Sequence, residues 1–377
     1  MSDDTLRRML ESYFSTKQPV YTFAWQGGEP TLMGLDFFRR VVELQRELAP
    51  PGAQITNAIQ TNGTLITEEF ARFLAEKKFL VGVSIDGPEE IHDRYRRGLS
   101  GAGGAGEADG GSLQPPAGGP THWTVVRGLR TLQAAGAELN AVTVVNNINV
   151  HHASLLYEYI RDELGIRWHQ YIPLVEWDQD GTLLPFSITG EQWGSFLNEL
   201  FERWYPRDVR RVSVRFFDSV LQLLALGKVV QCTMGGRCDS YLVVEHNGEV
   251  YPCDFYVEPE WRLGMLSSAV LSETRRTPGV SKFAAQKSRW PAECDGCPYL
   301  MLCSGDCPRM RRGDAVSHLC AGWKSFYEKH LEDLRGLAAS VPGYNGGVDR
   351  IMRESDPEAP CFCGSGKRFA NCHGREA

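Results

Sequence analysis

The sequence predicts an α/β protein whose first half alternates strands with helices. Short apolar runs such as Val20–Trp25 and Leu80–Ile85 are each followed by a glycine-rich turn, and amphipathic stretches such as Asp36–Leu48 come between them. This alternation is typical of βα units around a parallel sheet. About five repeats of this kind predict a complete or partial barrel of the TIM type. A second observation concerns the eleven cysteines, which all follow residue 231 and predict a separate cysteine-rich region.

The individual elements are expected in a regular order. The expected strands are Val20–Trp25, Ile55–Gln60, Leu80–Ile85, Leu139–Val145 and Trp168–Val175. The expected helices are Thr5–Ser15, Asp36–Leu48, Thr67–Lys77, Trp123–Ala135, His152–Glu163, Gly190–Trp204 and Ala321–Ala339. Thr67 is suited to cap its helix, because Glu68 and Glu69 follow in the positive first turn. The strand ends are polar and rich in glycine, and in such barrels the chemistry lies at these ends.

Changes in composition divide the chain into regions. Residues 1–227 form the barrel region, interrupted at 98–122 by a stretch of Gly, Ala and Pro that is expected to be a flexible insertion. Residues 228–335 form the cysteine-rich region, and 336–359 read as a linker. Residues 360–377 form a small cysteine and histidine module.

Overall composition narrows the class of protein. Hydrophobic residues make up 42% and charged residues 23%, which is ordinary for a globular protein. The net charge of −7 gives no basic footprint for nucleic acid, and no apolar run approaches the roughly 20 residues that span a bilayer. The polar first residues lack the apolar core of a signal peptide, so a cytoplasmic location is expected. In a reducing compartment, patterned cysteines indicate metal binding or catalysis rather than disulfides.

Eight central cysteines have the spacing of metal ligands. They read Cys232-x5-Cys238-x14-Cys253, then Cys294-x2-Cys297-x5-Cys303-x3-Cys307, and then Cys320. Eight thiolates suit two four-iron clusters with four cysteine ligands each. Two zinc sites with four thiolates each are the alternative. The run that ends in Cys307-Pro308 is similar to ferredoxin-like runs and favours iron and sulfur.

Several motifs in the same order resemble one enzyme family. They are FAWQGGEPTLMGLDFFRRVVELQ, NAIQTNGTLI, FLVGVSIDGPEEIHDRYR, NAVTVVN, QYIPLVE and LVVEHNGEVYPCDFYVEPEWRLG, together with the spacing of the eight cysteines. Across about residues 1–335 the chain resembles radical S-adenosylmethionine (radical SAM) enzymes with a SPASM extension, most closely the anaerobic sulfatase-maturating enzymes. The resemblance implies a partial (β/α)6 barrel that lacks its first strand in this sequence, followed by a SPASM domain.

The same resemblance implies a binding site for S-adenosylmethionine at the strand ends. The residues expected to line it are Gly27, Gly28, Glu29, Asn62, Ser84 and Arg96. Glu29 and the two glycines would hold the amino group, whereas Ser84 and Arg96 would hold the carboxylate. A guanidinium group suits a carboxylate because the two can pair through two parallel hydrogen bonds. Gln26 would contact the substrate peptide.

The resemblance also assigns the cysteines and a general base. The first auxiliary [4Fe-4S] cluster would take Cys232, Cys238, Cys253 and Cys307. The second auxiliary [4Fe-4S] cluster would take Cys294, Cys297, Cys303 and Cys320. Asp254 matches the family's base and would accept the proton that is released during oxidation. On the residues alone, Asp254 can equally be a loop residue with a structural hydrogen bond.

The cluster that would cleave S-adenosylmethionine has no ligands in this sequence. Family members hold it with a Cys-x3-Cys-x2-Cys loop after the first strand, and no cysteine precedes Cys232 here. Three explanations for the absent ligands remain open. The given sequence starts late or is a fragment, the protein is a degenerate paralogue, or a second polypeptide supplies the loop. We expect the reading frame upstream of Met1 to encode the loop, so that a third [4Fe-4S] cluster belongs only to a full-length form.

The C-terminal module resembles the SEC-C zinc motif. Its expected zinc ligands are Cys361, Cys363, Cys372 and His373. Such a short segment cannot bury a core, so zinc would supply its folding energy. The neighbouring Lys367, Arg368 and Arg375 suggest docking to an acidic partner.

The family resemblance implies oxidation of a Cys or Ser in a sulfatase polypeptide to Cα-formylglycine without oxygen. The implied partners are the sulfatase polypeptide and an electron donor such as a flavodoxin or ferredoxin, with no membrane and no nucleic acid. Two alternatives remain open: a SPASM maturase of another peptide, and a non-catalytic protein that binds iron–sulfur clusters and zinc. His151 and His152 are expected to be surface or capping residues, and Asp86 is expected to organise its turn.

Overall fold

The computed structural model describes residues 1–98, 118–205, 207–266, 270–313, 315–359, 361, 367–372 and 374. Most of the expected insertion at 98–122 therefore lies outside the described residues. The chain divides into two compact units. A barrel unit comprises Lys17–Ile188 and Glu199–Arg215, and a cysteine-rich unit comprises Met1–Thr16, Thr189–Asn198 and Phe216–Ala377. The first helix thus groups with the cysteine-rich unit and not with the barrel unit.

The barrel unit is built on a parallel sheet of six strands. In spatial order these are β1 (Val20–Trp25), β2 (Gln54–Thr61), β3 (Leu80–Ser84), β4 (Glu138–Val145), β5 (Trp168–Pro173) and β6 (Ser213–Val214). Each strand pairs with the next one in sequence, and Val20 lies beside Gln54 in the first pair. The predicted α/β fold with a parallel sheet is therefore confirmed, and the sheet contains one strand, β6, beyond the five that the sequence predicted.

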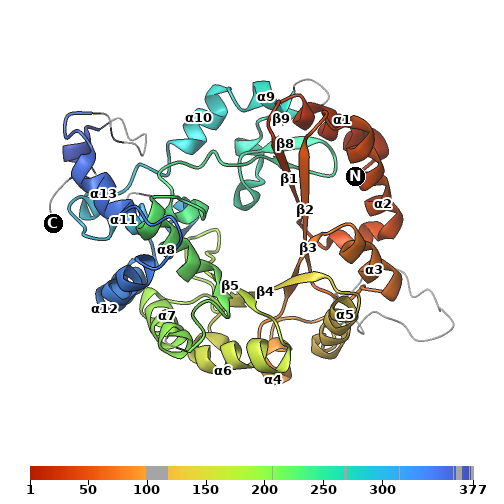
Figure 1. Cartoon of the computed structure of the whole chain (residues 1–377), viewed down its shortest axis with the longest axis horizontal. Helices are drawn as coiled ribbons and strands as arrows, with labels where there is room; N and C mark the ends of the chain where they lie inside the picture. Colours follow the sequence, from red (N-terminus) through yellow and green to blue (C-terminus); the bar gives the residue numbers. More distant parts are fainter. Residues whose placement is uncertain are drawn as a thin grey trace. The chain divides into compact units, whose positions relative to one another are not determined.

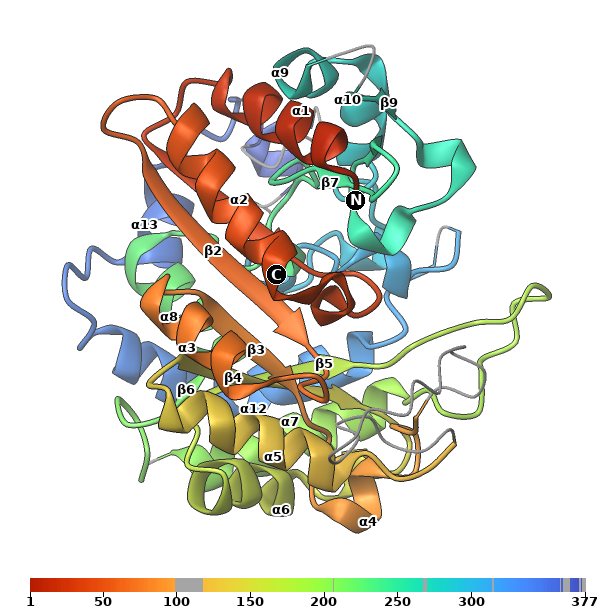
Figure 2. The ribbon, with the colours of Figure 1, turned by 90° about the vertical axis from the view of Figure 1, so that its right-hand side faces the viewer.

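Helices cover the outer side of this sheet (Figure 1). They are α2 (Gly34–Leu48), α3 (Glu68–Glu76), α4 (Glu89–His92), α5 (His122–Ala134) and α6 (Ala153–Glu158), which continues as a π-helix over Tyr159–Glu163. Thr67 caps α3 as predicted, because its side chain accepts a hydrogen bond from the Phe70 N–H. The buried core between strands and helices includes Phe38, Phe70, Val81 and Leu129. In Figure 2, α2 runs alongside β2 and α3 lies beside β3.

The cysteine-rich unit contains short elements and one long helix. Its strands β7 (Val243–Val244), β8 (Glu249–Tyr251) and β9 (Gly264–Met265) form an antiparallel sheet. Its helices are α1 (Asp3–Phe14), α9 (Leu271–Thr274), α10 (Pro278–Ala284), α11 (Leu300–Cys303), α12 (Cys320–Ala338) and α13 (Gly347–Glu354). Two further helices, α7 (Gly190–Trp204) and α8 (Arg215–Leu226), belong partly to each unit.

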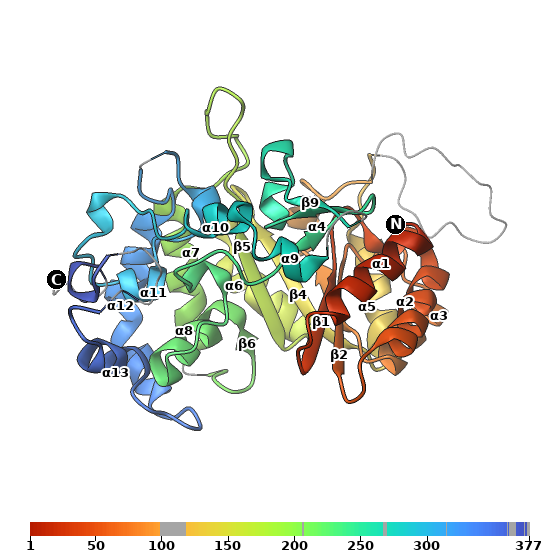
Figure 3. The ribbon, with the colours of Figure 1, turned by 90° about the horizontal axis from the view of Figure 1, so that it is seen from above.

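Close packing joins the first part of α7 to the start of α12. A Cβ atom on Gly194 would lie 2.8 Å from the Cα of Gly322, so the two helices touch through their backbones. Helix α13 occupies part of the stretch that was expected to be a linker, and Figure 3 shows it beside α12. No described helix is both long and apolar enough to cross a bilayer.

Candidate active site

Glu29 ties the loop after β1 to the end of β2. Its Oε1 accepts hydrogen bonds from the Thr31 N–H at 3.0 Å, the Thr31 hydroxyl at 2.5 Å and the Thr61 hydroxyl at 2.7 Å. Its Oε2 accepts one hydrogen bond, from the Asn62 N–H at 2.7 Å. The Asn62 side chain in turn accepts from the N–H and hydroxyl of Thr64. Glu29 and Asn62 are therefore held in fixed positions at the strand ends.

Gly27 and Gly28 form an open turn directly before Glu29. Their φ angles are +92° and +55°, a backbone region that residues with a side chain rarely adopt. A Cβ atom at either position would meet no atom within 4 Å. The glycines are thus required by the shape of the turn, and the backbone there is accessible to a ligand.

A second group of polar residues lies between β2 and β3. The Gln60 side chain donates to the Ser84 hydroxyl at 3.0 Å. Gly82 makes room for this contact, because a Cβ atom there would lie 2.1 Å from the Gln60 Oε1. Ser84 is therefore oriented by Gln60, which the sequence did not single out.

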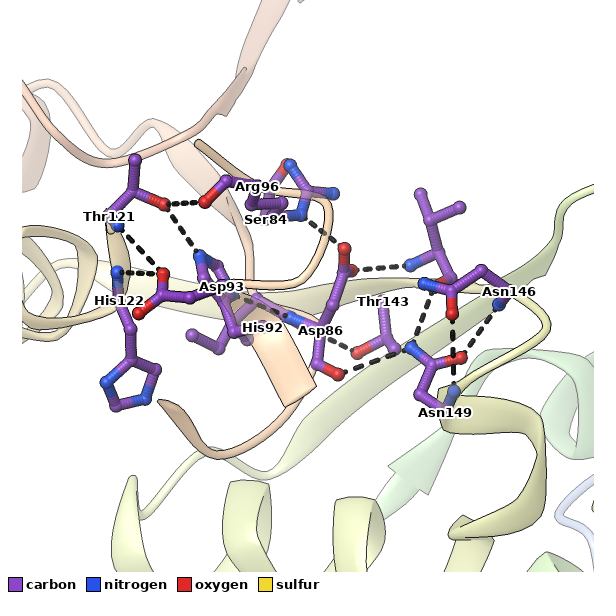
Figure 4. Close-up of polar contacts among 12 residues, drawn as sticks. Ser84, Asp86, His92, Asp93, Arg96, Thr121, His122, Thr143, Asn146 and Asn149 are labelled. Atoms are coloured by element: carbon purple, nitrogen blue, oxygen red, sulfur yellow. Dashed lines mark hydrogen bonds and ion pairs between the residues drawn. The ribbon is translucent and has the colours of Figure 1, made fainter. Parts of the chain in front are cut away.

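Arg96 is anchored by the buried carboxylate of Asp86 (Figure 4). The Arg96 Nε donates to one Asp86 oxygen at 2.5 Å, and the other oxygen accepts from the Val144 N–H at 2.9 Å. The Asp86 side chain is 6% exposed, whereas that of Arg96 is 25% exposed. Asp86 organises its turn, as expected, and it also supplies the counter-charge of the predicted carboxylate-binding arginine.

A chain of hydrogen bonds through His92 supports the Arg96 backbone. The Asp86 N–H donates to His92 Nδ1, so the ring proton lies on Nε2 and is donated to the Thr121 hydroxyl at 3.0 Å. That hydroxyl donates to the Arg96 carbonyl at 2.7 Å. Burial lowers the pKa of His92 to about 2, which keeps the ring neutral and this direction of donation fixed. Asp93 completes the network by accepting from the Thr121 and His122 N–H groups.

These residues fit the amino and carboxylate groups of S-adenosylmethionine. A carboxylate has about four lone-pair sites, and Glu29 Oε2 keeps one for an ammonium donor. Among the described residues, the terminal nitrogens of Arg96 have no hydrogen-bond partner, so they can pair with a carboxylate. The barrel unit thus offers an anionic group after β1 and a cationic group in the segment after β3.

The first predicted set of cysteines is gathered around short turns. Cys232 begins a 3₁₀ turn, and Cys253 and Cys307 each precede one. Burial raises the pKa of Cys238, and ionisation of Cys232 would raise it further. Burial likewise raises the pKa of Tyr256, which ionisation of Cys307, Cys253 or Cys238 would raise further. Burial raises the pKa of Cys253 to about 11 and that of Cys307 to about 12, so these thiols are protonated without a metal.

The second predicted set is coupled in the same way. Burial raises the pKa of Cys303 and that of Cys294, the latter to about 11, and ionisation of Cys320 would raise both further. Metal binding would replace protons on these thiols, which is the chemistry expected of buried cysteine ligands. The ten described cysteines form no disulfide, and no described group of His, Cys, Asp or Glu could hold a single metal ion.

A strained loop connects the two sets. Ser304, Gly305 and Asp306, between Cys303 and Cys307, have φ angles of 47°, 67° and 61°. Such angles are costly for Ser and Asp and are found where the surrounding structure enforces them. The Arg311 side chain donates to the carbonyls of Gly305 and Asp306 at 2.7 and 2.8 Å, which holds the loop in this shape.

Asp254 lies exposed at the start of its 3₁₀ turn, next to Cys253. The Tyr241 hydroxyl donates to Asp254 Oδ1 at 2.7 Å and lies 3.4 Å from the Cys253 sulfur. Burial, together with the neighbouring thiol and carboxylate, raises the pKa of Tyr241, so its hydroxyl remains a donor. The carboxylate is therefore oriented by Tyr241 beside a predicted cluster ligand.

The described part of the C-terminal module packs on the second set of cysteines. Cys361, Phe369 and Cys372 are buried in one apolar cluster with Trp290 and Cys294. Lys367 also pairs with Asp295 at 3.4 Å. The predicted zinc ligands Cys363 and His373 lie outside the described residues.

Comparisons with known proteins agree with this arrangement. Family profiles match the radical SAM superfamily at residues 1–160, an iron–sulfur cluster-binding domain at 232–298 and the SEC-C motif at 359–375. A serine-type anaerobic sulfatase-maturating enzyme from Bacteroides thetaiotaomicron is 33% identical over 87% of this chain and 80% of its own length. A cysteine-type enzyme from Clostridium perfringens is 34% identical over 90% of both. The chain belongs to the family of anaerobic sulfatase-maturating enzymes.

Solved structures of this maturase family share the fold. The structure of native anSMEcpe with bound AdoMet and Kp18Cys peptide has a TM-score of 0.80 and 34% identity, and the match covers 90% of this chain and 91% of that one. Streptococcus suis SuiB, at 14% identity and a TM-score of 0.54, shares the fold alone. The radical SAM, SPASM and SEC-C regions predicted from the sequence are thus confirmed, as is membership of a radical SAM oxidoreductase family that uses iron–sulfur clusters.

Several residues around the maturase site were not predicted from the sequence. They are Gln60, His92, Thr121, Tyr241 and Asn149. The side-chain amide of Asn149 donates hydrogen bonds to the carbonyl oxygens of Asp86 and Val144. The ion pair between Asp86 and Arg96 could have been predicted. A partly buried arginine that binds a carboxylate ligand needs a counter-charge, and Asp86 lies ten residues before Arg96. The other contacts depend on distant parts of the fold.

Proposed function

We propose that this protein oxidises a Cys or Ser side chain of a sulfatase polypeptide to Cα-formylglycine without oxygen. The observation that carries this proposal is the match, over nine-tenths of both chains, to a maturase solved with AdoMet and a cysteine peptide. S-adenosylmethionine, when bound and reductively cleaved, supplies the radical that removes a hydrogen atom from the substrate side chain.

The barrel unit of this chain would bind and orient that cofactor. Glu29 Oε2, with the open backbone of Gly27 and Gly28, would accept hydrogen bonds from its amino group. Ser84 and the terminal nitrogens of Arg96 would hold its carboxylate, with Asn62 at the same opening. Two opposite charges at fixed positions determine which way the reacting end of the cofactor faces. Gln26, which follows β1, would contact the substrate peptide.

In the cysteine-rich unit, Asp254 would accept the proton that the substrate side chain loses. A carboxylate must be in position before the proton leaves, and the Tyr241 hydrogen bond provides that orientation.

The two coupled sets of thiols would each hold one [4Fe-4S] cluster. Cys232, Cys238, Cys253 and Cys307 would form the first, and Cys294, Cys297, Cys303 and Cys320 would form the second. Such clusters would supply one-electron transfer for the electron released from the substrate, and a flavodoxin or ferredoxin would serve as the electron donor. Thiols of this kind persist in a reducing compartment, which supports a cytoplasmic location. Cys361, Cys363, Cys372 and His373 would bind one zinc ion and stabilise the C-terminal module.

The function is tested by anaerobic incubation with a sulfatase peptide that carries Cys, and with its Ser counterpart. The protein is expressed from its genomic reading frame, including any residues upstream of Met1. We expect an aldehyde in one or both peptides, read by mass spectrometry. Cleavage of S-adenosylmethionine with neither peptide altered would instead indicate a maturase of another peptide. Retention of iron without any cleavage would indicate a non-catalytic binding protein.

The role of Asp254 is tested in the same assay. Asp254→Asn should reduce aldehyde formation about 100-fold or more, because the proton acceptor is lost while cofactor binding is not. Cleavage of S-adenosylmethionine should persist. Glu260→Gln, in an exposed turn six residues later, is the matched control and should leave the rate unchanged. Equal rates for both variants would exclude Asp254 as the base.

A further inference from the structure

Lys287 is a completely buried lysine in the cysteine-rich unit. It follows α10 and has 0% of its surface exposed, although lysine is among the residues least often buried. Its Nζ donates to the carbonyl oxygen of Thr233 at 2.6 Å and to that of Asp306. Burying an ammonium group is costly unless charge and hydrogen bonds compensate for the lost water. The position therefore calls for a reason beyond packing.

The two carbonyls place the Lys287 ammonium at the junction of the two cysteine sets. Thr233 follows Cys232, a member of the first set. Asp306 lies in the strained loop that joins Cys303 of the second set to Cys307 of the first.

The nearby carboxylate of Asp306 is not a direct partner of the Lys287 ammonium. Its Oδ2 accepts from the Ser317 hydroxyl at 2.6 Å and the Trp323 indole at 2.9 Å, and its Oδ1 accepts from the Cys307 N–H. Arg311 adds a second cation and donates to the Lys287 and Asp306 carbonyls at 3.0 and 2.8 Å. Two cations thus accompany one carboxylate, which leaves one positive charge in excess among these three groups.

We propose that Lys287 is a positioning and tuning residue that raises the reduction potentials of both auxiliary clusters. This inference rests on the proposed assignment of two clusters to the eight cysteines. A four-iron cluster with four thiolates is anionic, and reduction adds a further negative charge. A buried cation stabilises the reduced form more than the oxidised form, because charges interact strongly where water is excluded. A cation shared between the sets acts on both clusters and eases entry of the substrate electron.

The experiment compares variants of the reconstituted protein under argon. Iron content and EPR-monitored redox titrations are measured for the wild type, Lys287→Met, Lys287→Gln and Lys287→Arg. Lys282→Met is the matched control, because Lys282 lies five residues earlier and is exposed. In the two neutral variants we expect both midpoints to become more negative, with at least a tenfold change in each one-electron equilibrium, about 59 mV. Lys287→Arg and Lys282→Met should change these equilibria less than twofold.

Each other outcome has a distinct meaning. Full iron content with unchanged midpoints in the neutral variants would overturn the proposal, and so would a shift confined to one cluster. Loss of iron from both neutral variants would also overturn it and indicate a purely structural role, in which Lys287 holds the Cys303–Cys307 loop. A wild-type iron content well below that of two four-iron clusters would instead refute the assignment of the eight cysteines on which the inference rests.

Discussion

Replacing Asp86 by Asn should destabilise the barrel unit far more than the change of one atom suggests. The substitution keeps the shape and one oxygen for the Val144 N–H, but it leaves the Arg96 guanidinium without its counter-charge. Removing one partner of a buried ion pair costs about 3–5 kcal/mol. Asp86 is 6% exposed but Arg96 is 25% exposed, so water recovers part of this loss. We expect a decrease of about 2–3 kcal/mol in the free energy of unfolding.

The measurement is urea unfolding followed by hydrogen-exchange mass spectrometry of β3 and β4 peptides, which reports on the barrel unit alone. Asp36→Asn is the control, because Asp36 pairs with Arg39 at a similar distance of 2.8 Å but is 93% exposed. An exposed pair of this kind contributes below about 1 kcal/mol. In Arg96→Met, a further Asp86→Asn change should cost much less than in the wild type. Equal costs for Asp86→Asn and Asp36→Asn would refute the reasoning.

Three further predictions concern other parts of the molecule. Glu29→Gln replaces one carboxylate acceptor by an amide NH2 donor that faces other hydrogen-bond donors, and it should cost about 1–3 kcal/mol in urea unfolding, whereas the exposed Glu43→Gln should cost almost nothing. The pKa of His92 is about 2 in the folded protein and about 6.5 when unfolded. Its contribution to stability is therefore complete above pH 6.5 and is lost as the pH falls toward 2. Between pH 7 and 5.5 the wild type should lose about 1 kcal/mol more than His92→Asn; equal losses would contradict the burial of a neutral ring. Phe369→Ala should lower the free energy of unfolding by about 3–5 kcal/mol, because a buried aromatic ring is lost. It should also speed the loss of iron in air, measured by iron assay. Unaltered retention of iron would show that the C-terminal module does not protect the second set.

The sequence predicted the long periodic elements of the fold well. The bounds of β1 and α7 coincide with the expected ones, because apolar runs and amphipathic spacing are strong over these lengths. The strands β6, β7 and β9 were missed, since two residues are too few to show a period, and the three-residue β8 and the twelve-residue helix α8 were missed as well. Helix α13 was read as part of a linker because its surroundings are polar and contain Gly and Pro.

The candidate site was predictable where one residue carries its own signal. Cysteine spacing singled out Cys232 through Cys320, whereas Glu29 was assigned through the family resemblance of its motif. Residues that act through partners gave no such signal: His92 contacts Thr121 across 29 positions, and Lys287 contacts Thr233 across 54. These contacts exist only once the chain has folded, so no local pattern encodes them.

The packing of Phe369 and Cys372 on Trp290 and Cys294 implies an order of events during biosynthesis. Ribosomes make Cys294 through Cys320 well before residues 361–372. Until those later residues emerge and dock, the side of Trp290 and Cys294 that they cover would remain exposed. The C-terminal module would then act as a closing step, sealing the second set only after translation has passed it.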